Sequence, residues 1–209
     1  MTDGPLRWLC ERAGLHHGTV ALSITQLGSS MINSVFMFYY VKVFHNKYGI
    51  TDSWFQVAQV LFMIWNALND PLFGYLQDVG KGWMRVRRYS ILYGAPFFAL
   101  SFLIAWFPWT DSKASEWLVG VHLIVALFFY DGLFSFVLLA YCALFAETTT
   151  DHSNRVRALK YNQTFLLIGS NIIVVVEKCS DSLRNFGAFQ MVCVVVSLVA
   201  FLCFSYTGC

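Results

Sequence analysis

The residues with the clearest potential for chemistry are two carboxylates that stand inside long apolar stretches. Asp70 lies in the string WNALNDPLFG, and Asp131 lies in the string FFYDGLFSF. A carboxylate among lipid tails costs about 2.5–3.5 kcal/mol or more, so it is expected to face water, a cavity or a protein partner. We therefore take both as candidate functional groups. The alternative for Asp131 is a neutral carboxyl group that hydrogen-bonds to a neighbouring helix.

Polar side chains recur around Asp70 at helical spacing. Separations of three, seven and four residues place four of them on one helical face, namely Gln56, Gln59, Asn66 and Asp70. We expect this face to look into a helix bundle. Asp70 and Asn66 are then the candidate ion or proton site, and Gln59 lines a substrate pathway.

A second polar strip occurs in the first apolar stretch, where Gln26, Ser29, Ser30 and Asn33 fall within two turns. Facing the Asp70 strip across a shared cavity, Gln26 and Asn33 would line the pathway together with Asp131. The alternative is that these side chains only hydrogen-bond between membrane helices.

The composition indicates the environment of these residues. Hydrophobic residues make up 57% of the chain and charged residues only 12%, against about 25% charged in soluble domains. The sequence therefore predicts a membrane protein whose main partner is the lipid bilayer. The net charge of +2 gives no support for nucleic acid. Without an H-E-x-x-H, G-x-S-x-G or C-x-x-C motif, the sequence predicts no enzyme, metal or cofactor.

Apolar stretches of about 20 residues mark transmembrane helices. They predict an all-α protein with a short N-terminal segment, 1–17, and a six-helix bundle over 18–209. The expected spans lie near 18–42, 52–76, 89–107, 117–146, 162–177 and 186–206.

The basic residues predict the orientation of the bundle. With the N-terminus in the cytosol, nine Lys and Arg residues lie on the cytosolic side and five on the other side. The positive-inside rule then places both termini in the cytosol. It does not distinguish the plasma membrane from an internal membrane.

A charged segment follows the second span. Gly74 and Asp78 are spaced as G-x-x-x-D, and Arg85, Arg87 and Arg88 come next. A carboxylate at a helix end, held by arginine, can act as a gate or a latch. The alternative is that the arginines serve only membrane orientation and contact with anionic lipid.

The string from Trp65 to Arg88 resembles the major facilitator superfamily, whose loop signature is G-x-x-x-D followed by basic residues. Its W-x-A-x-N-D-P-x-x-G core is similar to the glycoside-pentoside-hexuronide:cation symporter branch, the melibiose permease relatives. The resemblance extends over most of the chain, but only over the N-terminal half of that family. It implies a bundle with weak inverted repeats of three helices, and alternating-access transport of a sugar-like or other small organic solute.

The chain departs from that family at its functional positions. Where cation-coupled members have two carboxylates four residues apart, this chain has Asn66 and Asp70. One carboxylate holds a hard cation more weakly than two, which disfavours sodium coupling and leaves proton coupling through Asp70 open. The sugar-binding carboxylates of the family fall near Gln26 and Leu138 here. Sugar specificity is therefore not implied.

The family binds its solute between two six-helix halves. The resemblance thus implies two kinds of partner, an unidentified small-molecule solute and either a C-terminal six-helix half or a second copy of this chain. The rival interpretation is a truncated membrane protein or scaffold that transports nothing.

Overall fold

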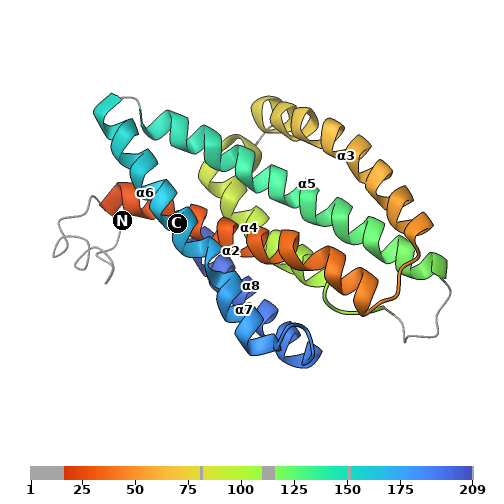
Figure 1. Cartoon of the computed structure of the whole chain (residues 1–209). Coiled ribbons are helices and arrows are strands. Elements are labelled where there is room, and N and C mark those ends of the chain that lie inside the picture. Colours follow the sequence, from red (N-terminus) through yellow and green to blue (C-terminus); the bar gives the residue numbers. More distant parts are fainter. Residues whose placement is uncertain (1–16, 81, 110–115, 150–151, 209) are drawn as a thin grey trace.

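The computed structural model describes residues 17–80, 82–109, 116–149 and 152–208. Within these ranges it contains only helices joined by short turns, which confirms the all-α prediction (Figure 1). The expected N-terminal segment, 1–17, lies outside the described ranges except for its last residue.

The helices follow the expected spans closely, since apolar stretches of this length favour helix in a membrane. Short turns separate most of them. In chain order they are α2 (His17–Asn46), α3 (Asp52–Val79), the short η1 (Gly82–Arg85), α4 (Arg87–Ile104), α5 (Glu116–Thr148), α6 (His152–Ser170), α7 (Ile172–Ser180) and α8 (Phe186–Gly208).

The fifth span differs most from its expected range of 162–177. Its helix begins ten residues earlier, at His152, because the polar stretch before the span is rich in good helix formers such as Arg and Lys. The helix breaks at Asn171, where α6 gives way to α7. There the side chains of Asn171 and Ser170 both donate to the Leu167 carbonyl, at 2.6 and 3.0 Å. Such local hydrogen bonds compete with the helical backbone.

Four segments of the described chain are long and apolar enough to cross a membrane. They are Thr19–Asn46, Glu116–Thr148, His152–Ser180 and Phe186–Gly208. The helices α3 and α4 are not among them, because α3 carries the polar strip and α4 is short and begins with two arginines. Six helical units therefore fit the expected bundle, four of them with the full signature of a membrane span.

Two long helices, α2 and α5, organise the packing. α2 packs against α6, α7 and α8, and α5 packs against α3 and α4, while α4 and α8 complete the bundle (Figure 1). The starts of α5, α6 and α8 come 99, 100 and 99 residues after those of α2, α3 and α4. Their packing corresponds as well, because the contact of α2 with α6 matches that of α5 with α3, and the contact of α4 with α5 matches that of α8 with α2.

The core follows the crossing of α2 and α5. There the Phe36 and Tyr130 rings stack with centroids 3.7 Å apart. At one end of the bundle the Thr25 hydroxyl donates to the Thr207 hydroxyl at 2.7 Å, so the start of α2 lies beside the end of α8. These contacts fix the helices that carry the candidate residues.

Candidate functional site

The helix α3 packs against α5 along one narrow strip. The fully buried residues on α3 are Ala58, Asn69 and Gln77, and each faces the bundle. Most of the other α3 side chains are exposed, including apolar ones such as Leu68 at 61%. α3 is therefore a peripheral helix, and its polar contacts with α5 carry the site.

The centre of the site is the buried carboxylate of Asp131 on α5, which is 8% exposed. Its Oδ1 accepts a hydrogen bond from Asn66 Nδ2 at 3.2 Å, and its Oδ2 accepts one from Asn69 Nδ2. The side-chain oxygen of Asn69, Oδ1, is buried and has no hydrogen-bond partner in the described chain. Asp131 is thus held by two amides with an unused amide oxygen beside it.

Asp70 lies elsewhere than the sequence predicted. It is exposed, it makes no hydrogen bond or ion pair within the described residues, and its charge lies within electrostatic range of Asp131. The expectation that the Gln56 to Asp70 face looks into the bundle is wrong for Gln56 and Asp70, which are both exposed on a flank of α3. The other two residues of that face do turn toward the bundle, since Asn66 donates to Asp131 and Gln59 Nε2 is buried.

The polar contacts continue from α5 to α2. The Tyr130 hydroxyl donates to Asn33 Oδ1 at 3.3 Å, next to Asp131 in the chain. The α2 and α3 strips are therefore bridged by α5 and do not face each other directly. We call this set the polar belt, and its members are Asn33, Asn66, Asn69, Tyr130 and Asp131.

The remaining pathway candidates lie outside the polar belt. Gln26 and Gln59 are both half-buried on their helices. Gln59 Nε2 is buried without a hydrogen-bond partner among the described atoms. An amide in this state has free capacity for a ligand or a water molecule.

The crossing of α2 and α6 matches that of α5 and α3 in the repeated packing pattern, but its chemistry differs. Here the Ser30 hydroxyl donates to the Leu166 carbonyl at 2.8 Å. A Cβ on Gly169 would lie 2.8 Å from the Leu27 carbonyl oxygen. This crossing is closed by close backbone approach, whereas the other is closed by a carboxylate and two amides.

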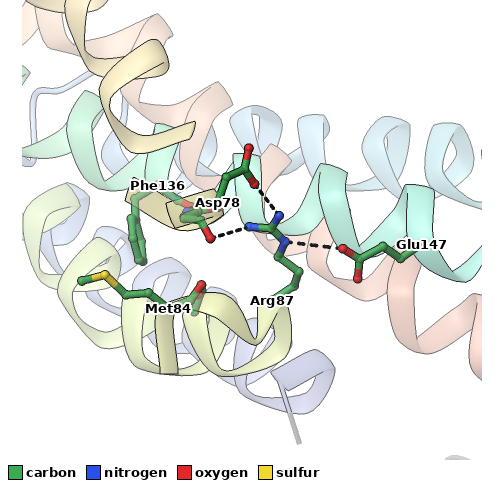
Figure 2. A network of polar contacts seen from close by, with 7 residues as sticks. Asp78, Met84, Arg87, Phe136 and Glu147 are labelled. Atoms are coloured by element: carbon green, nitrogen blue, oxygen red, sulfur yellow. Dashed lines mark hydrogen bonds and ion pairs between the residues drawn. The ribbon is translucent and has the colours of Figure 1, made fainter. Parts of the chain in front are cut away.

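A second charged cluster ties three helix ends together. Arg87 at the start of α4 forms ion pairs with Asp78 at 2.6 Å and with Glu147 at 3.5 Å, and Figure 2 shows its side chain between them. Arg87 Nη1 also donates to the Gln77 carbonyl at 3.2 Å. Gln77 Nε2 in turn donates to the Phe136 carbonyl of α5 at 2.7 Å. We call Asp78, Arg87 and Glu147 the arginine latch.

The other residues of the charged segment are not part of the latch. Gly74 is half-buried, and a Cβ placed on it would meet nothing within 4 Å. Arg88 is exposed and has no ion-pair partner in the described chain. The side chain of Arg85 lies outside the described part of the structure.

Sequence reasoning missed Asn69, Tyr130 and Glu147 as members of these clusters. A signal for Asn69 was present, since it is four residues from both Trp65 and Phe73, whose rings also pack against α5. Glu147 comes directly after the apolar part of α5, and in the structure it lies beside Arg87 at the start of α4. Neither signal identifies the partner helix, which depends on tertiary packing.

These features define a polytopic membrane protein with a mid-bundle polar belt and a charged latch at one end. The chain belongs to the family described as MFS/sugar transport protein, whose model matches residues 22–207. It is 31% identical to transmembrane protein 180 of Mus musculus over 93% of this chain. It is 29% identical to transmembrane protein 180 of Gallus gallus over 84% of this chain.

The chain spans just over a third of the length of these relatives, 38% of the mouse protein and 36% of the chicken protein. No solved structure matches it. The resemblance seen in the sequence, to the major facilitator superfamily, is confirmed at the level of the family.

Proposed function

We propose that this chain forms one six-helix half of a major facilitator transporter that moves a sugar-like or other small organic solute by alternating access. The repeated packing of α2 to α4 and α5 to α8 supports this proposal, since such repeats are typical of secondary transporters. The half would be completed by a C-terminal half or by a second copy. Both termini are proposed to lie in the cytosol. No covalent step on the solute and no cofactor is part of the proposal.

The observation that carries the proposal is the polar belt. It links three helices at the middle of the bundle, where transporters of this type bind their solutes. Gln26, Asn33 and Gln59 are proposed to line the pathway beside it. Asp131 joins Asp70 and Asn66 in the ion or proton site, because its carboxylate is the buried one and has no basic partner within the described chain. Proton coupling is favoured over sodium coupling.

One observation favours the alternative, a membrane protein that does not transport. Both oxygens of Asp131 are engaged by amides, so the carboxylate already serves to join α3 and α5. In that case substitution of the belt changes assembly or expression level and leaves solute flux unchanged.

The two functions are separated by an uptake experiment. Uptake of labelled sugars and other small solutes is measured in cells that produce this chain alone, or this chain fused to the part of the mouse relative that it does not match. A transporter predicts uptake by the fusion that depends on external pH and is lost in Asp131→Asn. Absence of flux from the fusion would reject transport of the tested solutes. Flux that is present but indifferent to Asp131→Asn and to Asp70→Asn at every pH would reject coupling through these carboxylates.

A further inference from the structure

A cavity of about 450 Å³ lies between α3, α4 and α5. This volume falls within the range of about 300–1,000 Å³ found for small-molecule sites. Trp65 and Phe73 of α3 form one wall, Leu100 and Ile104 of α4 form the other, and Gly132 of α5 lies at the base. The cavity exists because α3 and α4 both pack against α5 and leave space between them.

The lining of this cavity offers no accessible polar group. The Ser101 hydroxyl donates to the Phe98 carbonyl at 2.8 Å, and Ser101 is only 2% exposed. The indole nitrogen of Trp65 is buried and has no hydrogen-bond partner among the described atoms, and its burial keeps it from a ligand in the cavity. All other lining side chains are hydrocarbon or aromatic. Because a buried polar group without a partner is costly, the part of a ligand that enters must be hydrocarbon.

The cavity opens sideways, where lipid surrounds a membrane protein. Its rim includes Phe97 and Leu100, each 61% exposed, and Phe129, which is 56% exposed. Trp65 and Gly132 lie near the middle of α3 and α5, far from the helix ends that would reach the membrane surface. Since α5 is long and apolar enough to cross a membrane, an opening at its middle lies at the depth of the hydrocarbon core, which is about 30 Å thick.

We propose that the cavity holds the hydrocarbon tail of a bilayer phospholipid whose headgroup stays at the membrane surface. Such a tail reaches the middle of the bilayer from its surface and needs no polar partner there. The site is separate from the polar belt, and it does not depend on whether the protein transports a solute.

The bound tail also supports the contact between α3 and α5. Trp65 stacks on Phe128 with centroids 5.1 Å apart, and a Cβ on Gly132 would lie 3.2 Å from Trp65 Cζ2. Trp65 and Gly132 are the chain neighbours of Asn66 and Asp131, which form a hydrogen bond. A tail that presses Trp65 against α5 therefore favours the geometry of that hydrogen bond. Loss of the bound tail should weaken the packing of α3 against α5.

The proposal is tested with the full chain in vesicles that contain a phosphatidylcholine with a photoreactive group near the end of one tail. After illumination, the labelled peptides are mapped by mass spectrometry. We expect saturable labelling of peptides that contain residues 97–104 and 128–133. Excess unlabelled phosphatidylcholine should suppress it at least fivefold more strongly than labelling of the exposed α8 residues. Equal suppression at both places means ordinary surrounding lipid and overturns the proposal.

A matched pair of substitutions adds a second test. Leu100→Trp fills the mouth of the cavity and should reduce the labelling at least fivefold, whereas Leu202→Trp, at an exposed position on α8, should leave it unchanged. Unchanged labelling in Leu100→Trp overturns the proposal. A photoreactive sterol that labels the same peptides and excludes the phosphatidylcholine overturns the assignment of the occupant. If either variant fails to fold, the saturation experiment on the unsubstituted chain decides alone.

Discussion

The side-chain amide of Asn69 donates a hydrogen bond to Asp131 across the crossing of α3 and α5. The next residue, Asp70, is exposed on the flank of the same helix. A single step along a helix turns the side chain by about 100°, which separates a residue that joins two helices from one that faces outward. This crossing matters for stability because α5 is the only long helix against which α3 packs closely in the described chain.

Asn69→Leu should destabilise the fold. It leaves the buried Asp131 with a single amide partner, Asn66, and an underused carboxylate oxygen costs about 1–3 kcal/mol. Unfolding of the purified chain in mixed micelles measures the change. Asp70→Asn serves as the control and should change stability by less than about 0.5 kcal/mol, because Asp70 is exposed and unpaired in the described chain. Equal effects of the two substitutions would contradict the hydrogen-bond geometry.

Asp131→Asn and Asp131→Leu should separate hydrogen bonding from charge. An amide at this position still accepts a hydrogen bond from Asn69, so Asp131→Asn should cost about 1 kcal/mol or less. Leucine accepts nothing and leaves the fully buried Asn69 amide unsatisfied, which should cost about 1–3 kcal/mol. The same unfolding measurement ranks them. A larger cost for the asparagine variant would mean that the ionised carboxylate itself is required.

Much of the fold could be predicted from the sequence, because apolar stretches of bilayer length are strong signals. The rotation of each helix about its own axis, which decides which side chains face the bundle, could not be predicted. Lipid is as apolar as a protein core, so the exposed Leu68 and the partly buried Trp65 look alike in the sequence. The polar residues on α3 were correctly grouped on one face. Only the position of α5 shows that Gln56 and Asp70 are exposed at the edge of this face, and that Asn69 points inward beside Asn66.

The start of the fifth helix shows a second limit. Hydropathy places the start of the fifth span after Arg157 and Lys160, but the helix itself begins earlier, at His152. Helix propensity and membrane burial are separate properties, and the apolar pattern reports only burial. Only part of the arginine latch was predicted, because the sequence shows which residues are close in the chain and not which are brought together by packing. Asp78 and Arg87 are close in the chain, whereas Glu147 is brought to them by packing.

Gly169→Ala should destabilise the crossing of α2 and α6. Its Cβ would lie 2.8 Å from the Leu27 carbonyl oxygen and 2.9 Å from Ser30 Cβ, so the helices must move apart. Overpacking of this kind costs about 1–3 kcal/mol. Gly74→Ala is the matched control, since nothing lies within 4 Å and alanine favours a helix by about 0.5–1 kcal/mol. Thermal unfolding in detergent should therefore move in opposite directions for the two variants.

The proposed orientation can be tested with inserted glycosylation sequons. A sequon in the exposed turn at Gly49, between α2 and α3, should be modified when the chain is made in a cell with a secretory pathway. One inserted at Gly82, after α3, should stay unmodified. The natural sequon at Asn162 gives no information, because Asn162 is only 9% exposed within α6. The reverse pattern of modification would reject cytosolic termini.

Arg87→Ala should weaken the link between the ends of α3, α4 and α5, whereas Arg88→Ala should not. Both substitutions remove one positive charge from the same turn, but only Arg87 contacts Asp78 and Glu147. Asp78 and Glu147 are 70% and 61% exposed, so each ion pair contributes about 1 kcal/mol or less. The hydrogen bond from Arg87 to the Gln77 carbonyl adds a contribution that salt does not screen strongly.

The expected result is a loss of about 1 kcal/mol in unfolding free energy for Arg87→Ala and less than about 0.5 kcal/mol for Arg88→Ala. The difference should shrink at 1 M salt, where the Debye length falls to about 3 Å. Limited proteolysis near Thr149 should also speed up in Arg87→Ala alone. If the two variants behave alike, the arginines act through their charge on orientation and lipid contact, and the latch has no separate role.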